Sequence, residues 1–156
     1  MELMLNENHF VIKRMQDGTE VDIEYIKNFI SGHSDVKVYV GTDSQNRTGW
    51  TNFACCIVLH FDGKGGHVLY GRKGVHRIND EFNRLWQEVC ISVELATHLK
   101  ENGIKVDFVD LDYNIDPQYM SNRVLQSALG YVKGSGFIPR PKPNTISSVI
   151  ADVLCR

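Results

Sequence analysis

The order of strand-like and helix-like segments constrains the fold of this 156-residue chain more than any other feature of its sequence. Three segments in the first half are rich in β-branched or apolar residues and are separated only by turn residues, a pattern typical of an antiparallel meander. They are residues 36–43, 53–61 and 67–73. The middle segment is apolar on both faces, so we expect it to be a central strand.

Helical and extended segments alternate in the second half of the chain. Hydrophobic periodicity and capping residues predict, in order, a long helix, a strand, a second helix, a short strand and a final helix. These span residues 80–102, 104–114, 116–129, 131–137 and about 144 onward. A strand that follows a long crossover helix normally lies parallel to a neighbouring strand. The order therefore predicts an α/β fold with a mixed five-stranded sheet, an antiparallel meander followed by parallel strands, and helices on both faces.

A shorter region, residues 1–35, precedes this pattern. It contains an extended piece over residues 9–15. The helical spacing of Ile23, Ile26 and Ile30 predicts a helix over residues 19–30. The length and the 42% hydrophobic content of the chain suit one hydrophobic core. We therefore expect a single domain over residues 1–156, with the first 35 residues packed on it as a short helical extension.

Composition argues against several classes of protein. No apolar run is long enough to span a bilayer and the N-terminus lacks a signal-peptide core, so we expect a cytoplasmic protein with no membrane partner. The four cysteines predict reduced thiols, because adjacent Cys55 and Cys56 would point to opposite faces of a strand and cannot share one metal ion. The net charge of the chain is −2, whereas many nucleic-acid-binding proteins are strongly basic. Basic residues can nevertheless cluster locally on an acidic chain.

Acidic residues recur where the predicted strands end. Asp43 ends the first strand of the meander, and Asp110 and Asp112 lie near the end of the strand that follows the long helix. The last two share a face because they are two residues apart on a strand. If these strands are parallel neighbours, Asp43 lies near that pair. Glu88 in the long helix and Asp152 in the last helix are further candidates for the same cluster.

Carboxylates packed this closely repel one another unless protons or cations intervene. Mg²⁺ and Mn²⁺ prefer oxygen ligands, and two such ions about 4 Å apart can activate a water and stabilise the leaving oxygen of a phosphodiester. The acids therefore favour a metal-dependent hydrolase. Taken singly, each has a simpler interpretation, since a strand-end Asp often forms a turn and a helical Glu is usually solvated.

Four segments carry a resemblance to a known family: VYVGTDSQ, RLWQEV, VDLDYN and KPNTISSVIAD. Together they resemble the bacterial YkuK-like family, a ribonuclease H-like group, over residues 36–152. The resemblance implies a ribonuclease H-like fold and a nuclease site that uses two Mg²⁺ or Mn²⁺ ions. It assigns the catalytic metal ligands to Asp43, Glu88, Asp112 and Asp152.

The resemblance also assigns Lys142 a catalytic role. Asp110 stands where the family pattern has a histidine, and an additional acid there would either bind metal or alter the site. Glu94 is a rival of Glu88, but six positions along a helix turn it to a different face, so at most one of the two joins the cluster.

Five further residues are expected to contact nucleic acid: Ser44, Gln45, Arg77, Arg84 and Asn114. Ser44 alternatively helps the turn after Asp43, and the basic segment around Arg77 is alternatively a solvated loop. Four aromatic residues are candidates for stacking on bases: Trp50, Trp86, Tyr113 and Tyr131. For Trp86 we favour core packing.

Two functions remain open from the sequence. One is a metal-dependent nuclease that acts on nucleic acid. The other is a non-catalytic ribonuclease H-like module that binds nucleic acid or a protein. Convergence of the acids would favour the nuclease, whereas Glu88 or Asp152 pointing elsewhere would favour the module. The sequence does not distinguish RNA, DNA and hybrid substrates, and it does not reveal the oligomeric state.

Overall fold

The structure is a computed structural model that describes residues 1–61, 65–114, 116–142, 145 and 151. Its centre is a meander of three long antiparallel strands, β4 (Val36–Asn46), β5 (Trp50–Phe61) and β6 (Gly66–His76). The predicted meander is confirmed, and β5 is a central strand, as its two apolar faces indicated.

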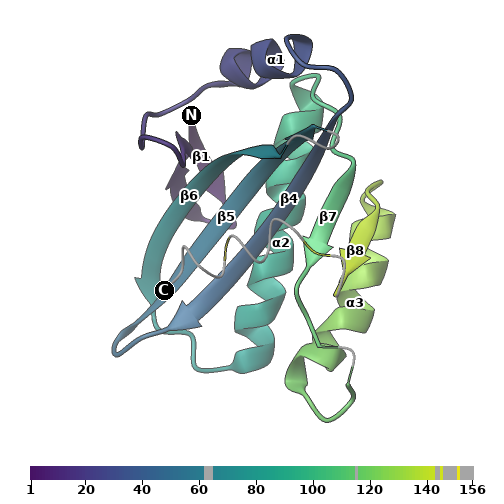
Figure 1. Ribbon diagram of the computed structural model, residues 1–156. Helices are drawn as coiled ribbons and strands as arrows, with labels where there is room; N and C mark the ends of the chain where they lie inside the picture. Colours follow the sequence, from purple (N-terminus) through teal and green to yellow (C-terminus); the bar gives the residue numbers. More distant parts are fainter. Residues whose placement is uncertain (62–64, 115, 143–144, 146–150, 152–156) are drawn as a thin grey trace.

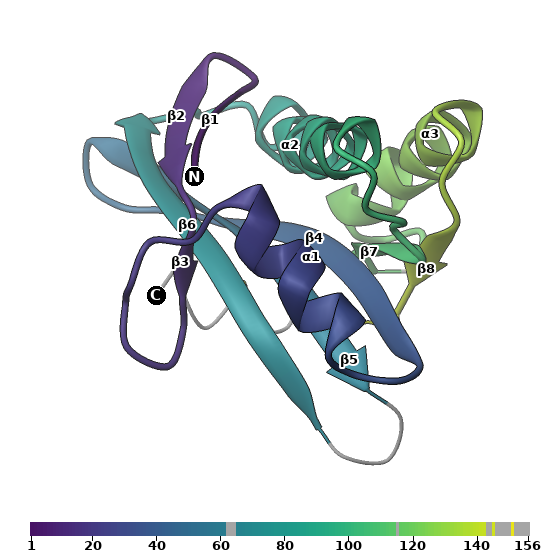
Figure 2. The same cartoon turned by 90° about the horizontal axis from the view of Figure 1, so that it is seen from above.

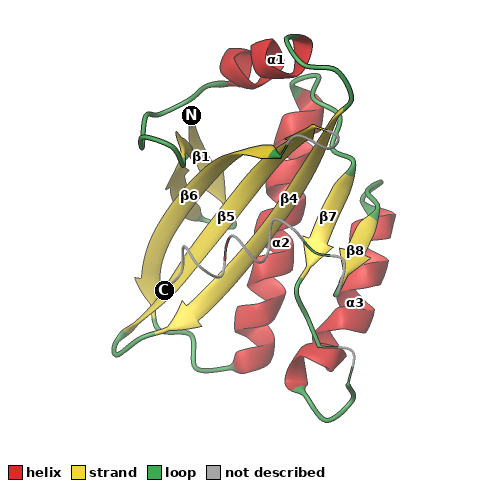
Figure 3. Cartoon of the chain, in the orientation of Figure 1, coloured by secondary structure: helices red, strands yellow, loops and turns green. Residues whose placement is uncertain are grey.

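Two short parallel strands extend the sheet beside β4, namely β7 (Phe108–Leu111) and β8 (Pro139–Pro141). On the other edge, β3 (Lys13–Arg14) pairs antiparallel with β6. The order is β3-β6-β5-β4-β7-β8, and Figure 3 shows the sheet in yellow. The mixed sheet is confirmed, but it has six strands where five were expected, because part of the N-terminal extension pairs with the free edge of β6.

The N-terminal region also forms a separate hairpin of β1 (Glu2–Leu5) and β2 (Asn8–Val11). Its turn residues, Asn6 and Glu7, both have positive φ, as the commonest two-residue hairpin turns require. The predicted helix of this region is α1 (Ile23–Ser31), which begins four residues later than expected. Its N-cap is Asp22, whose side chain accepts a hydrogen bond from the Tyr25 N–H at 2.8 Å.

The long helix α2 (Glu81–Glu101) follows the meander and is capped by Asp80, as predicted. It ends before Gly103, whose φ of +84° suits glycine. Helix α2 packs on the sheet beside α3 (Met120–Gly134), and Figure 2 shows both helices on one face. The main core lies in this interface, with Val89 and Leu95 of α2 and Phe53 of β5 all fully buried.

Two segments of the second half differ from the sequence prediction. The Asp116 side chain accepts a hydrogen bond from the Gln118 N–H and holds a turn, so α3 begins at Met120 and not at residue 117. The helix then continues through Gly130 to Gly134, because Val132 is buried in the core. The strand expected over residues 131–137 is therefore wrong, and the chain becomes extended only at β8, after Gly136 at φ +91°.

The opposite face of the sheet has a smaller buried cluster. Ala54 and Cys56 of β5 pack there against Ala151, whereas Cys55 belongs to the main core. The adjacent cysteines thus point to opposite faces, and Cys55, Cys56 and Cys90 are free thiols. Most of the helix expected from residue 144, together with Cys155, lies outside the described residues. Within the described part of the chain, no helix is long and apolar enough to cross a membrane.

Candidate functional site

The first two candidate acids lie on neighbouring parallel strands. In the β4–β7 ladder Gly41 pairs with Asp110. Two residues farther along each strand lie Asp43 and Asp112, and the period of two keeps these side chains on the same face as that pair. Strand β4 continues to Asn46, past the last residue of β7, so Asp43 lies beside the point where the two strands cease to pair. The predicted adjacency of the two strands is confirmed.

Glu88 enters the same region from α2. Its side chain is only 2% exposed, and Ser44 Oγ donates a hydrogen bond to its Oε1 at 2.5 Å. Four residues along α2, Ser92 donates to Thr42 on β4 at 2.8 Å. The spacing of four residues on a helix, about 6 Å, matches two residues on a strand, about 7 Å. These two contacts therefore fix the register of α2 on β4 and place Glu88 at the level of Ser44, the residue after Asp43.

The environment of Glu88 disfavours its charged form. Burial raises its pKa well above the usual range, and the neighbouring Asp43 carboxylate raises the pKa further. The Ser44 hydrogen bond and the Arg84 guanidinium, whose Nη1 lies 3.8 Å from Glu88 Oε1, oppose this shift without cancelling it. The positive charge of Arg84 is thus too small to offset the combined effect of burial and of the Asp43 carboxylate on the pKa of Glu88.

Glu94 does not share this site. Its carboxylate accepts a hydrogen bond from the backbone N–H of Asn6, in the turn of the β1–β2 hairpin. The structure therefore places Glu88 against Ser44, the residue after Asp43, and directs Glu94 toward the N-terminal hairpin.

Tyr113 is buried near Glu88. It is 3% exposed, and its hydroxyl donates a hydrogen bond to the Leu85 carbonyl of α2 at 2.8 Å. Burial and the nearby Glu88 raise the pKa of this phenol well above its usual range. A ring so deeply buried is part of the packing, so the interpretation of Tyr113 as a base-stacking surface is wrong.

Asp112 has a cationic partner. Lys142, directly after β8, places its Nζ 3.0 Å from Asp112 Oδ1. This Oδ1 is buried and has no aligned hydrogen-bond donor among the described residues, so the contact is an ion pair without hydrogen-bond geometry. Half of the Lys142 side chain remains exposed, at 48%. Lys142 therefore reaches the acid cluster from the solvent side.

Asp110 has a structural environment. Its side chain is fully buried, and Arg140 of β8 donates two hydrogen bonds to it, at 3.0 and 3.3 Å. The guanidinium lies 4.2 Å from the ring centroid of Tyr39 and 5.1 Å from that of Phe108. Arg140 was not singled out from the sequence, because the strand that carries it was expected several residues earlier. The additional acid of the VDLDYN motif thus joins β7 to β8.

At least four of the five residues expected to contact nucleic acid make hydrogen bonds within the protein. Ser44 is 5% exposed and points to Glu88, and Arg84 Nη1 donates to Ser44 Oγ at 2.8 Å. Asn114 Oδ1 accepts a hydrogen bond from the Asp116 N–H in the loop after β7. Arg77 is exposed and donates to Asn79 and to the Arg47 carbonyl, and Gln45 lies half-buried on the same face as Asp43.

The donor atoms at this end of the sheet suit a hard divalent cation, because Asp43, Glu88 and Asp112 all offer carboxylate oxygens. Among the described residues, however, no group of three or more Asp, Glu, His or Cys side chains is arranged to hold a metal ion. Asp152, the fourth expected ligand, lies outside the described residues. The described chain thus has Asp43 and Asp112 at one end of the sheet, with Asp112 paired with a lysine, and Glu88 on the α2 side of β4, where it contacts Ser44.

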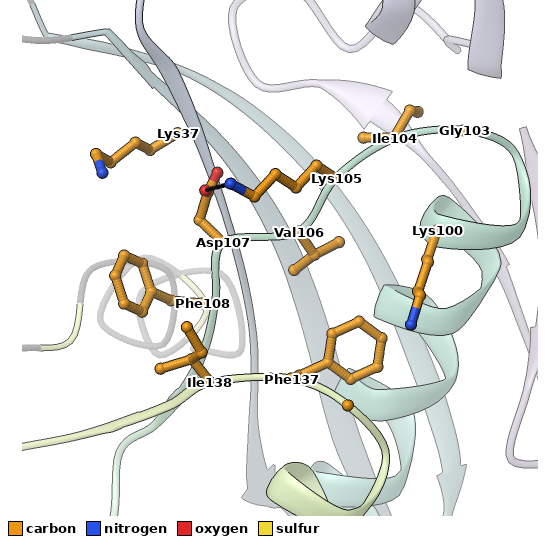
Figure 4. Close-up of a pocket in the computed structure, with 11 residues that line it drawn as sticks. Lys37, Lys100, Gly103, Ile104, Lys105, Val106, Asp107, Phe108, Phe137 and Ile138 are labelled. Atoms are coloured by element: carbon orange, nitrogen blue, oxygen red, sulfur yellow. Dashed lines mark ion pairs between the residues drawn. The ribbon is translucent and has the colours of Figure 1, made fainter.

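A pocket of about 680 Å³ lies elsewhere, where β4 and β7 begin. Figure 4 shows three lysines around it, Lys37, Lys100 and Lys105. The Lys100 ammonium lies 5.6 Å from the Phe137 ring centroid, and Lys105 pairs with Asp107 at 3.4 Å. Along β4 the pocket is about 20 Å from Asp43, so it is separate from the acids.

Comparison with known proteins agrees with the motifs. A family model described as Ribonuclease H-like matches residues 22–156, from the cap of α1 onward. Among solved structures, RNase H1 from the halophilic archaeon Halobacterium salinarum NRC-1 is similar at 19% sequence identity and a TM-score of 0.39. That alignment covers 69% of this chain and 86% of the archaeal chain. None of the curated proteins matches.

Proposed function

We propose that this chain, which belongs to the ribonuclease H-like family, is a metal-dependent nuclease that hydrolyses phosphodiester bonds of nucleic acid. The observation that carries the proposal is Glu88, a carboxylate that is 2% exposed and that Ser44 holds within electrostatic range of Asp43. Burial and the like charge of Asp43 both disfavour its ionised form, and the contacts with Ser44 and Arg84 offset this only in part. Side chains whose pKa is strongly shifted in this way are concentrated at functional sites.

Asp43, Glu88 and Asp112 would hold Mg²⁺ or Mn²⁺, with Asp152 as the fourth expected ligand. When bound, two such ions supply an activated water and stabilise the leaving oxygen. The contribution of the chain itself is orientation. Ser44 and Arg84 hold the Glu88 side chain in one position, and they act through Glu88 without touching nucleic acid.

Lys142 is proposed as a point charge at the open side of the site. Its ammonium group lies beside Asp112 and is half exposed, so a phosphate that approaches the acids would meet it. A lysine on a flexible stem can exchange a carboxylate partner for a phosphate at little cost. Gln45 and Arg77 are proposed as further contacts to the nucleic-acid backbone, whereas the Asn114 side chain shapes the loop after β7.

One observation favours the second candidate, a non-catalytic module that binds nucleic acid or protein. Lys142 pairs with Asp112 and Arg84 lies near Glu88, so cations of the chain already offset part of the acidic charge. In a module of this kind the acids would be a buried polar network that needs no metal ion.

The deciding experiment compares the purified protein with its Asp43→Asn variant. Labelled RNA, DNA and RNA–DNA hybrid are incubated with each protein in Mg²⁺, in Mn²⁺ and in chelator, and thermal melts are recorded with and without millimolar metal. We expect the variant to lose cleavage and the metal-induced rise in melting temperature. Its metal-free stability should be unchanged or higher, because one of several like charges is removed.

A matched control is Asp22→Asn, which removes the same charge from the cap of α1, outside the acid cluster. Asparagine caps helices as well as aspartate does, so this variant should keep both cleavage and the response to metal. A destabilised Asp43→Asn protein that still responds to metal would show that Asp43 forms a turn, and the nuclease proposal would lose its central ligand.

A further inference from the structure

The face of the sheet that carries Asp43 continues across the meander. Asp43 pairs with Ala54 on β5, and Ala54 pairs with Arg72 on β6. Four residues from Ala54 on the same strand lies Trp50, which the period of two keeps on the same face. These side chains therefore belong to one surface, on which Trp50 is about 14 Å from Asp43.

Trp50 is exposed on this surface. Half of its area, 50%, is open to solvent, whereas Trp86, the other tryptophan of the chain, packs against the main core. Its cross-strand partner is the exposed His76. An exposed aromatic ring offers a flat surface on which a nucleic-acid base can stack.

Gly74 leaves room beside the indole. It lies on β6 opposite Asn52, between Arg72 and His76 on the same face. A Cβ atom at this position would lie 3.4 Å from Asn52 Oδ1 and 3.9 Å from Trp50 Cδ1. Any longer side chain would therefore cover the edge of the indole. The glycine keeps a flat, side-chain-free area next to Trp50, and Asn52 presents an amide at its border.

A positive charge lies on the neighbouring strand of the same face. The Arg72 guanidinium of β6 is exposed and is 5.8 Å from the ring centroid of Tyr70. It is about 10 Å from Asp43 across two strand spacings, on the other side of the buried Ala54. The face thus combines an exposed aromatic ring, an open area with an amide, and one arginine on the adjacent strand.

We propose that Trp50 is a stacking platform for a base of single-stranded nucleic acid, and that Arg72 contacts a phosphate of the same strand. This inference rests on the proposed function, because it treats Asp43 as the place where the strand is cut. Stacking on an aromatic side chain requires a base whose face is exposed, which a single strand provides and an intact duplex does not. Duplex binding draws most of its affinity from many phosphate contacts, and a chain of net charge −2 is poorly suited to them.

The test is a binding titration in chelator, so that no strand is cut and the result does not depend on catalysis. Fluorescently labelled single-stranded oligonucleotides and the corresponding duplexes are titrated with the protein, and anisotropy and tryptophan fluorescence are both recorded. We expect binding of the single strand with quenching of tryptophan emission, and much weaker binding of the duplex.

Variants separate stacking from charge. Trp50→Ala should weaken single-strand binding roughly 5- to 100-fold, the range of one lost base–aromatic stack. Trp50→Phe should retain most of the affinity but lose the quenching, because only Trp86 remains to emit. Arg72→Ala should weaken binding and reduce its salt dependence. Lys73→Ala is the matched control, since this exposed residue is next in the strand and points to the other face.

Outcomes that overturn the inference are distinct from failure of the nuclease proposal. Unchanged affinity of Trp50→Ala, or duplex binding as tight as single-strand binding, would refute the stacking platform even if the protein cleaves. Absence of binding to every oligonucleotide would refute it in favour of a protein partner at Trp50. Binding that depends on Trp50 in a protein without cleavage would support the platform and refute only the nuclease.

Discussion

Replacing Glu88 with Gln is expected to stabilise the metal-free protein near pH 7. The substitution keeps the length and shape of the side chain, and the amide oxygen can still accept the hydrogen bond from Ser44. It removes a negative charge that is 2% exposed and within electrostatic range of Asp43. The free energy of unfolding should therefore rise, although a buried and hydrogen-bonded side chain has been changed.

The size of the effect follows from opposing contributions. The attraction between Glu88 and Arg84, with Nη1 and Oε1 3.8 Å apart, is worth about 4 kcal/mol at an effective dielectric of about 20. Burial of one carboxylate costs several kcal/mol, and Asp43 adds repulsion. The raised pKa of Glu88 shows that the costs exceed the attraction. We therefore expect a gain on the order of 1 to 3 kcal/mol, a shift in urea midpoint of about 0.5 to 1.5 M.

The sign of the pH dependence is fixed by the direction of the pKa shift. The folded-state pKa of Glu88 lies above the ordinary value of 4.5, so its protonated form is favoured by folding. Its contribution to stability is complete below pH 4.5 and is lost as the pH rises through the folded-state pKa. The two proteins should unfold at the same urea concentration near pH 4 and diverge at higher pH, with Glu88→Gln the more stable.

The assay is urea unfolding at several pH values, with and without Mg²⁺ or Mn²⁺. Metal at 100 times its dissociation constant should add about 2.7 kcal/mol to the native protein and much less to the variant. Glu94→Gln, on the same helix, is the control, because it removes a charge whose oxygen can still accept the Asn6 N–H as an amide, and it should keep the metal response. A Glu88→Gln protein that is less stable at pH 7 and still stabilised by metal would refute this account of the site.

Three further variants test individual contacts. Arg140→Met should lower the free energy of unfolding by about 3 to 5 kcal/mol, because the buried Asp110 loses two charged hydrogen bonds; a loss below about 1 kcal/mol in urea titrations would contradict the structural role of this pair. Lys142→Met should reduce cleavage while changing the melting temperature little, since the lysine is 48% exposed; undiminished cleavage would exclude it from catalysis. Tyr113→Phe should cost about 1 to 2 kcal/mol by leaving the Leu85 carbonyl without its donor, and calorimetry showing equal stability would contradict that contact.

The sequence by itself determined the elements with strong local patterns. The β-branched and apolar runs of β4 and β5 and the capped stripe of α2 appear where they were expected, because pattern and capping act over a few residues. It also determined that the strands of Asp43 and Asp112 are parallel neighbours, since a crossover helix leaves few alternatives. Glu88 was preferred over Glu94 on helix geometry and family motif together; in the structure Glu88 contacts Ser44, whereas Glu94 contacts the N-terminal hairpin.

Tertiary contacts decided the weaker segments. Residues 131–134 begin with two strand formers, Tyr131 and Val132, yet the burial of Val132 against the core extends α3 across them. Residues 13–14 became an edge strand only because β6 offers an unpaired edge. Short segments of this kind gain too little from local propensity to fix their own conformation.

The roles of individual site residues also required the tertiary structure. Strand periodicity puts Asp110 and Asp112 on one face without distinguishing their partners, yet one is joined to Arg140 and the other to Lys142, each thirty residues away. Ser44 was expected to face nucleic acid and instead orients Glu88, forty-four residues distant. The charge state and the accessibility of a carboxylate depend on every group within a few ångströms, and only the folded chain determines which groups those are.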